Sequence, residues 1–218
     1  GDGQLLFMLN GLAKLKDDGQ MAIIQNGSSL FNGDAGSGPS EIRRYLIEND
    51  WLDAIVQLPN DAFYNTNIAT YIWIVTKDKP VTHRGKVQLI DASECYSSRR
   101  KNVGSKRVDI TKACRDLIIK TYGVYVDGTY EYVDENDNSI TVKSKVMDSV
   151  EFGYNKITVE TPQFDEDGKV VMKRNKPVAD ASKRDTENVP LSEDIDAYFK
   201  REVIPYNPLA WIDKKKTK

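Results

Sequence analysis

The stretch LDAIVQLPNDAFYNTNIATYIWIVT, residues 52–76, decides the fold of this chain. Two apolar segments, residues 52–58 and 69–76, have the length and the β-branched and aromatic content of buried strands. The segment between them is short for a helical crossover, so we expect the two strands to be antiparallel neighbours. Its side chains combine a flat hydrophobic surface with hydrogen-bonding groups, which suits the binding of a planar polar ring such as a nucleobase. These side chains are Phe63, Tyr64, Asn65, Thr66 and Asn67.

The same residues also have a purely structural interpretation. In a wide loop, Asn65 and Asn67 would tolerate the left-handed backbone region, and Phe63 would simply pack below the strands. Taken alone, these residues leave both interpretations open and favour the structural one.

Composition limits the classes of function. The chain has 31 Lys and Arg against 33 Asp and Glu, so any contact with nucleic acid must come from local patches and not from a global positive field. A single histidine, His83, excludes sites that need several imidazoles, and it argues against a Ser-His-Asp triad. We predict no metal site.

Cysteine usage and hydropathy indicate the compartment. Cys95 and Cys114 lie in no C-x-x-C pair and cannot form a disulfide framework, so we expect ordinary buried thiols in a reducing cytoplasm. No apolar run approaches the roughly 20 residues of a spanning helix, and no signal peptide opens the sequence. We therefore expect a cytoplasmic protein that does not contact membranes.

Both ends of the sequence indicate a piece of a longer protein. Gly1 stands in place of an initiator methionine, and an amphipathic helical pattern over residues 4–16 begins almost at once. Residues 204–213 are still apolar and rich in aromatic side chains shortly before the lysine-rich tail.

The first part of the chain alternates helical and strand patterns. Residues 20–25 predict a short apolar strand, a helix opened by Pro39 runs to Asn49, and residues 86–91 predict another strand. Continuously apolar strands separated by helices indicate a sheet covered on both faces. The fold class predicted from these patterns is α/β.

After Asp91 the pattern changes. A helix is expected over about residues 109–122, and residues 124–174 alternate as small β-hairpins with turns at Asp127-Gly128, at Asp167-Gly168 and in the acidic segment 134–139. Residues 176–190 predict a polar loop or linker, followed by a helix at 193–203 capped by Ser192. We accordingly divide the chain into an α/β part (1–95), a basic loop plus helix (96–123), a hairpin insertion with linker (124–190) and a C-terminal helix and tail (191–218).

A basic cluster, RRKNVGSKR at residues 99–107, has two interpretations. Its five cations in nine residues would form a salt-sensitive phosphate contact, or else a solvated and disordered loop, and no aromatic side chain is interleaved with them. The cations are Arg99, Arg100, Lys101, Lys106 and Arg107.

Several stretches imitate catalytic motifs, and for each the structural interpretation is the stronger one. Residues 34–38, DAGSG, have the composition of a glycine-rich nucleotide loop, but residues 26–31 separate them from the strand that such a loop should follow directly. Residues 207–210, NPLA, lack the second proline and the aromatic of the Asn-Pro-Pro-aromatic signature of amino-group methyltransferases. The pairs Asp17/Asp18 and Glu135/Asp137 lie in turns with no apolar pocket to raise a pKa.

Several segments, in order, resemble one protein family. GQMAIIQNGSSLF, EIRRYLIEND, LDAIVQLPNDAFYNTNIATYIWIVTKDK and GKVQLIDAS are similar to the later half of the methylase domain in the modification subunit of type I restriction-modification systems, which are N6-adenine DNA methyltransferases. FGYNKITVETP and DTENVPLSEDIDAYFKREVIPYNPLAWID are similar to the C-terminal region of a subgroup of these subunits.

The resemblance implies a Rossmann-like class I methyltransferase sheet, of which this chain supplies the last strands. Phe63 falls where the family places an aromatic ring against the flipped adenine, with residues 64–67 shaping the pocket wall. Gln25 and Asn26, at the end of the first strand, are candidate contributors to the same pocket. The appended hairpin-containing and helical region follows the sheet.

The resemblance also implies what the chain lacks. The family's Asn-Pro-Pro-aromatic motif and glycine-rich cofactor loop would precede Gly1, so we expect S-adenosylmethionine to be bound by the full-length protein, with no tightly bound cofactor, no catalytic residue and no activity in this piece alone. The implied partners are DNA, a specificity subunit and a restriction subunit. Two alternatives stay open: a non-catalytic assembly domain on a methyltransferase-like scaffold, and a different Rossmann-like nucleotide enzyme.

Overall fold

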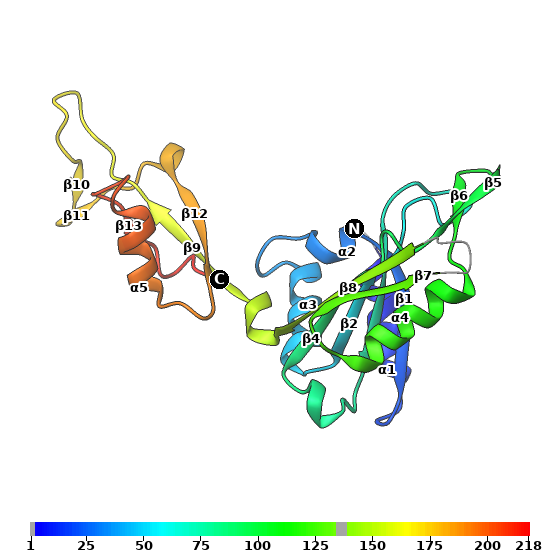
Figure 1. Ribbon diagram of the computed structural model, residues 1–218. Coiled ribbons are helices and arrows are strands. Elements are labelled where there is room, and N and C mark those ends of the chain that lie inside the picture. The colour runs from blue at the N-terminus through cyan, green and yellow to red at the C-terminus, as the bar shows by residue number, and fades with distance from the viewer. Residues whose placement is uncertain (1–2, 134–138) are drawn as a thin grey trace. The chain divides into compact units, whose positions relative to one another are not determined.

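A computed structural model describes residues 3–133 and 139–218 of the chain. The chain forms two compact units, Gly1–Ser149 and Val150–Lys218 (Figure 1). This division differs from the segments expected from the sequence, because the strands that follow the basic cluster return to the first sheet.

The first unit is built on a six-stranded mixed sheet, and the predicted α/β class is confirmed. The strand order is β1-β3-β2-β4-β8-β7. The strands are β1 (Gln20–Asn26), β2 (Leu52–Gln57), β3 (Thr70–Thr76), β4 (Lys86–Asp91), β7 (Gly128–Val133) and β8 (Ser139–Asp148). Because β3 is antiparallel to both β1 and β2, and β2 is parallel to β4, the carboxyl ends of β1, β2 and β4 lie at the same end of the sheet.

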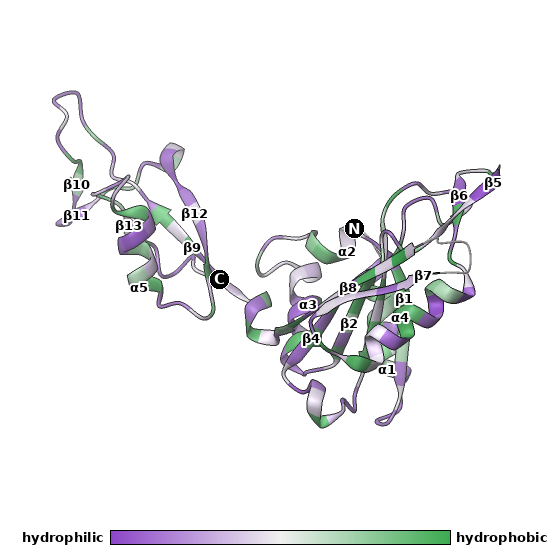
Figure 2. Ribbon diagram, viewed as in Figure 1, coloured by the Kyte–Doolittle hydropathy of each residue, from purple (hydrophilic) through white to green (hydrophobic). Residues whose placement is uncertain are grey.

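The antiparallel pairing predicted within residues 52–76 is confirmed. Tyr71 of β3 lies opposite Gln25 on one side and opposite Gln57 on the other, so β3 occupies the space between β1 and β2. A strand paired along both edges has its backbone groups satisfied and can be continuously apolar. Hydrophobic colouring is concentrated in the strands of this sheet (Figure 2).

Helices cover opposite faces of the sheet. On one face, α1 approaches β1 so closely that a Cβ on Gly11 would lie 2.4 Å from the sulfur of Met21, which pairs with Val75. On the other face, Val56 of β2 belongs to a buried cluster with Leu117 of α4. The helices are α1 (Gln4–Lys14), the short α2 (Ser28–Phe31), α3 (Gly38–Glu48) and α4 (Lys112–Val124). None of the helices in residues 3–133 and 139–218 is both long and apolar enough to cross a membrane.

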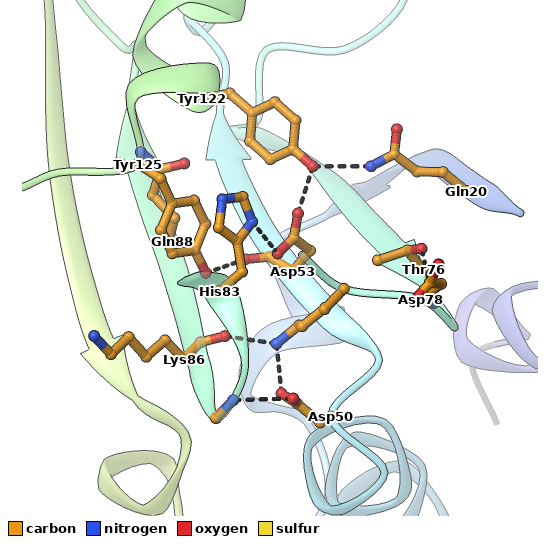
Figure 3. A network of polar contacts seen from close by, with 12 residues as sticks. Gln20, Asp50, Asp53, Thr76, Asp78, His83, Lys86, Gln88, Tyr122 and Tyr125 are labelled. Carbon is orange, nitrogen blue, oxygen red and sulfur yellow. Dashed lines mark hydrogen bonds and ion pairs between the residues drawn. The ribbon is translucent and has the colours of Figure 1, made fainter. Parts of the chain in front are cut away.

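A buried carboxylate fastens α4 to the sheet. A register irregularity between Leu52 and Ala54 surrounds Asp53, which is fully buried. The Tyr122 hydroxyl donates to the Asp53 carboxylate, and His83 Nδ1 lies 3.0 Å from the same group (Figure 3). Burial, followed by the hydrogen bond to Asp53, raises the pKa of Tyr122 well above its ordinary value. The ring of His83, in the 3-10 turn Val81–His83, stacks on Tyr125 with centroids 3.5 Å apart.

The region after β4 differs from the sequence prediction in three ways. The basic cluster is not a disordered loop but a hairpin of β5 (Ser97–Val103) and β6 (Lys106–Asp109). Thr111 caps α4, which begins at Lys112 and not near 109, because the Thr111 side chain accepts from the Cys114 amide. Asp127-Gly128 leads from α4 into β7 and is not a hairpin turn. The acidic turn at 134–139 lies, except for Ser139, outside the described residues.

The second unit has a three-stranded antiparallel sheet in the order β12-β9-β13. Its helical segment packs Phe199 and Val203 onto Ile157, Val159 and Val189 of the sheet. The elements are the 3-10 turn Ser149–Phe152 at its start, β9 (Tyr154–Glu160), β10 (Met172–Lys173), β11 (Lys176–Pro177), the 3-10 turn Ala181–Lys183, β12 (Asp185–Pro190), α5 (Ile195–Tyr198), the π-helical turn Phe199–Val203 and β13 (Trp211–Ile212).

Sequence patterns located some of these elements and missed others. The expected linker at 176–190 contains β12, which pairs with β9, because only Val189 is a buried apolar residue and the strand pattern is weak. The last helix begins two residues later than expected, since Asp194 and not Ser192 provides the cap. The turn at Asp167-Gly168 is confirmed by positive φ at Gly168. Residues 207–210 form the expected structural turn, in which the Ala210 amide donates to the Asn207 carbonyl.

Buried thiols give one prediction. Cys95 and Cys114 are both fully buried and free, and burial raises the pKa of Cys95 to about 12. We expect neither thiol to react with a disulfide reagent at pH 8 in the native protein, and both to react after denaturation in guanidinium. Rapid labelling of either thiol in the native state would contradict the packing of α4 against β4.

A buried acid in the second unit gives a prediction about pH. Glu160 is 2% exposed; burial alone would raise its pKa, but hydrogen bonds from Lys216 and Arg184 outweigh burial and hold the pKa below its ordinary value. Its contribution to stability is therefore complete above the unfolded pKa, near 4.3, and is lost as the pH falls through the lower folded value.

We expect Glu160→Gln to destabilise this unit at pH 7 by about 1–2 kcal/mol. The expected loss is smaller than for a fully buried ion pair, because the Arg184 and Lys216 side chains remain partly solvated. The same substitution should flatten the loss of stability between about pH 5 and pH 3. Amide hydrogen exchange of β9 against pH measures both effects. An unchanged pH dependence in the variant would show that Glu160 is not the titrating group.

Candidate functional site

The aromatic loop lies at the carboxyl end of β2. The Leu58 amide donates to the Thr70 carbonyl at 2.9 Å, which closes the loop of residues 59–69 at its base. Phe63 is partly buried against the cluster that contains Val56 and Leu58, whereas Tyr64 is 59% exposed. The Tyr64 ring therefore faces solvent, whereas the Phe63 ring packs in part against the core.

The structural interpretation of this loop is supported in one respect and wrong in another. Phe63 does pack against the core beneath the loop, and it forms an isolated bridge with Thr66. Neither Asn65 nor Asn67 has a positive φ; within the loop, only Asp61 does among its non-glycine residues. The amide side chains are exposed and are not needed to form the turn.

The structure brings the basic hairpin against this loop, although about 40 residues separate them in the sequence. The Ser105 amide donates to the Tyr64 carbonyl at 2.9 Å, and the Arg107 amide donates to the Asp61 carbonyl at 2.9 Å. Gly104 forms the hairpin turn with a φ of +59°, directly beside Tyr64. The loop and the hairpin, residues 59–69 and 97–109, are here called the loop–hairpin site.

The cations of the hairpin fall into two groups. Arg99 Nη1 lies 2.6 Å from the Asp109 carboxylate, and Lys106 Nζ lies 3.1 Å from it. Hydrogen bonds from these two cations hold the pKa of Asp109 below its ordinary value. Lys106 Nζ is also 5.4 Å from the centroid of the Tyr64 ring, within the range of a cation–π contact. The side chains of Arg99 and Lys106 are therefore engaged in contacts inside the loop–hairpin site and stabilise it.

The remaining cations face solvent. Arg100 and Lys101 are exposed, and within the described part of the chain neither forms an ion pair. Arg107 is 66% exposed and lies 4.0 Å from Asp61, at the limit of an ion pair. These three side chains can approach a polyanion without breaking a strong internal interaction.

Gln25 and Asn26 lie at the same end of the sheet. Asn26 pairs with Thr70, the residue that closes the aromatic loop. Its side-chain oxygen accepts from Gln4 Nε2 at 2.9 Å, so it holds the start of α1. Gln25 is 4% exposed; its Nε2 donates to the Gln4 carbonyl, and its Oε1 has no hydrogen-bond partner among the described residues.

The loop–hairpin site, residues 59–69 and 97–109, contains no imidazole and no thiol. No three His, Cys, Asp or Glu side chains in residues 3–133 and 139–218 are grouped to hold a metal ion. His83, the single imidazole, is engaged with Asp53 at the amino end of β2, at the far end of the strand from the aromatic loop. The glycine-rich segment 34–38 lies between α2 and α3, and its last residue, Gly38, is the first residue of α3. It is therefore not a loop at the end of a strand.

Sequence reasoning found the two parts of the site but not their contact. The contact between the loop and the hairpin is made by main-chain amides and carbonyls. Almost any residue type supplies these groups, so no side-chain pattern in the sequence predicts the contact. Gly104 was the one available signal, since a glycine within a cationic run indicates a tight turn.

Comparison with known proteins shows what the chain is similar to. The family model described as N-6 DNA Methylase matches residues 1–162. The Type I restriction enzyme MjaIX methylase subunit of Methanocaldococcus jannaschii is 31% identical over 105 residues, which cover 47% of this chain and 18% of that protein. The Type I restriction enzyme MpnII methylase subunit of Mycoplasma pneumoniae is 31% identical over 99 residues, covering 45% and 17%.

A solved structure supports the fold. The methyltransferase subunit of a type I restriction-modification system from Streptococcus thermophilus superposes with a TM-score of 0.54 at 26% identity, over 69% of this chain and 27% of that one. The chain thus spans less than a third of the length of these relatives. The predicted class I methyltransferase sheet is confirmed, and the chain belongs to the N-6 DNA methylase family.

Proposed function

We propose that this chain is part of an enzyme that transfers a methyl group from S-adenosylmethionine to the N6 amino group of adenine in DNA. The observation that carries the proposal is the loop–hairpin site: an aromatic, amide-rich loop joined to a cationic hairpin at the carboxyl end of β2, in a chain of the DNA methylase family. Open α/β sheets bind ligands at the carboxyl ends of their strands.

The chemistry of adenine explains why such a loop is useful. The N6 lone pair is delocalised into the ring, so the base must be extruded from the duplex and held in a fixed orientation before a methyl group can be transferred. We assign one wall of the target-base pocket to Phe63, Tyr64, Asn65, Thr66 and Asn67. Gln25 supports this wall from β1, since its buried Oε1 can accept a hydrogen bond, and Asn26 fixes the backbone beside it.

The hairpin provides the electrostatic part of the interface. Arg100, Lys101 and Arg107 are exposed and suited to contact phosphates, while Arg99 and Lys106 are already paired with Asp109. Of the five candidate phosphate contacts, we therefore assign the direct contacts to Arg100, Lys101 and Arg107, and a supporting role within the hairpin to Arg99 and Lys106. The near-neutral charge of the whole chain is compatible with phosphate binding at the hairpin, because the positive patch is local.

The methyl donor and the catalytic groups are assigned to the rest of the protein. This chain has no Asn-Pro-Pro-aromatic sequence, and its segment 34–38 does not fit a cofactor loop, so we derive no cofactor contact from these residues. One edge of β1 is unpaired among the described strands, and Ile24 on this strand is half exposed, which leaves a place for further strands. We propose that the active assembly is cytoplasmic and includes DNA, a specificity subunit and a restriction subunit.

The base-stacking role of Phe63 predicts the effect of two substitutions in the full-length subunit. Phe63→Ala should lower kcat/KM for adenine methylation by an amount equivalent to roughly 1–3 kcal/mol of stacking. Phe63→Leu keeps apolar packing beneath the loop but removes the aromatic face, so it should lower kcat/KM by a similar amount while its unfolding midpoint stays close to that of the wild type. Phe164→Ala, in the second unit, is the matched control. Full activity of Phe63→Leu would limit Phe63 to packing.

The phosphate contacts predict a change in salt dependence. The double variant Arg100→Gln/Lys101→Gln should reduce the slope of log K against log salt for DNA binding by up to about 1.8, since each phosphate that is no longer neutralised lowers the slope by about 0.9. Lys14→Gln/Lys16→Gln, near the C-terminal end of α1 and away from the loop–hairpin site, is the control and should leave the slope unchanged. Equal slopes for the two double variants would exclude the hairpin from the DNA interface.

A further inference from the structure

The hairpin and the aromatic loop are joined by their main chains, not only by proximity. Two amides on the hairpin, of Ser105 and Arg107, donate to two carbonyls of the loop, of Tyr64 and Asp61, each at 2.9 Å. The Val108 amide makes a longer contact of 3.4 Å with the same Asp61 carbonyl. The loop is therefore held along its first half by the returning strand of the hairpin.

Gly104 makes this contact possible. Its φ of +59° lies in the left-handed region, and a Cβ at this position would be 2.7 Å from the Tyr64 carbonyl oxygen. A side chain here would be strained and would also push the loop and the hairpin apart. Both the turn geometry and the close approach require glycine.

The outward cations lie on the same hairpin, in the part of β5 between Ser98 and Val103 where the pairing register is irregular. Arg100 and Lys101 are on β5, whose residues Ser98 and Val103 pair with Val108 and Lys106 of β6. Lys106 forms a further link between the hairpin and the aromatic loop, because it pairs with Asp109 of the hairpin and contacts the Tyr64 ring of the loop. The strand that carries Arg100 and Lys101 is thus joined, through β6 and the turn at Gly104, to the hydrogen bond that holds the Tyr64 carbonyl.

We propose that the β5–β6 hairpin is a positioning element: binding of the DNA sugar-phosphate backbone by its outer cations orders residues 61–67 before a base enters the pocket. In this account Gly104 is a positioning residue, and it acts through Tyr64. The inference rests on the proposed function for its ligand, DNA, but it concerns the order of events, namely that backbone contact organises the base pocket.

The test uses amide hydrogen exchange of residues 61–67 in the full-length subunit, with a duplex made only of G·C pairs. Such a duplex offers phosphates but no adenine, so no target base can fill the pocket. In the wild type, saturating duplex should slow exchange of this loop about fivefold or more, since ordering reduces local opening. Absence of slowing in the wild type would overturn the proposal.

Gly104→Ala should separate the loop from the hairpin. Exchange at residues 61–67 should be about tenfold faster than in the wild type without DNA, as expected when main-chain hydrogen bonds are broken, and the duplex should no longer slow it. Gly168→Ala is the matched control, because Gly168 also has a positive φ, of +74°, but no atom lies within 4 Å of its added Cβ. Equal exchange in the two alanine variants would overturn the proposal.

A second variant keeps the test decisive if Gly104→Ala does not fold. Arg100→Gln/Lys101→Gln leaves the main-chain contacts intact, so loop exchange without DNA should match the wild type, while the slowing by duplex should disappear. Retained slowing at a duplex concentration that saturates this variant would contradict the coupling. Failure of the proposed function has a different signature: the wild type would then methylate no adenine-containing DNA, whatever the exchange of its loop.

Discussion

The placement of β3 between β1 and β2 is the constraint on which the rest of the first unit depends. Because β3 is antiparallel to both neighbours, the chain leaves β2 at the carboxyl end of the sheet and must return there within the loop of residues 59–69. The loop is therefore confined to the carboxyl end of β2. Its position beside Asn26 of β1 follows from the same register, since Asn26 lies opposite Thr70.

The hairpin is fixed from its other side by α4. The strand β6 leads, through the cap at Thr111, directly into this helix. The helix is held on the sheet by the Tyr122 hydroxyl on Asp53, and by Gln88 Nε2, which donates to the Thr121 carbonyl at 3.0 Å. The hairpin is thus continuous with a packed helix at one end and hydrogen-bonded to the aromatic loop near its turn. This arrangement allows exposed cations and an exposed aromatic ring to keep a defined separation without a buried ion pair between them.

The sequence predicted those elements whose pattern is local. The strands of the first half and the antiparallel pair within residues 52–76 were confirmed, because continuous apolar runs bounded by turn residues have few other interpretations. The β5–β6 hairpin was missed because its residues are cationic and exposed, so no alternation of apolar residues marks the strands. Asp53 and His83 were also missed as partners: a register irregularity sets their contact, and a linear pattern cannot reveal it.

The candidate site was predicted in its parts and not in its assembly. Residues 63–67 and the cations at 99–107 were identified by chemical type, whereas their junction depends on backbone atoms at Asp61, Tyr64, Ser105 and Arg107. The pairing of Arg99 and Lys106 with Asp109 was equally invisible, since the acid lies outside the basic run. Side-chain chemistry thus pointed to the class of ligand that we propose, main-chain hydrogen bonds form the junction, and ion pairs with Asp109 decide which cations remain available.

The most direct test of the account is methyl transfer by the full-length protein. The subunit, assembled with its specificity subunit, should transfer labelled methyl from S-adenosylmethionine to duplex DNA, and nucleoside analysis should find the label only in N6-methyladenine. Label in cytosine, or no transfer by a folded assembly that binds both DNA and the methyl donor, would contradict the account.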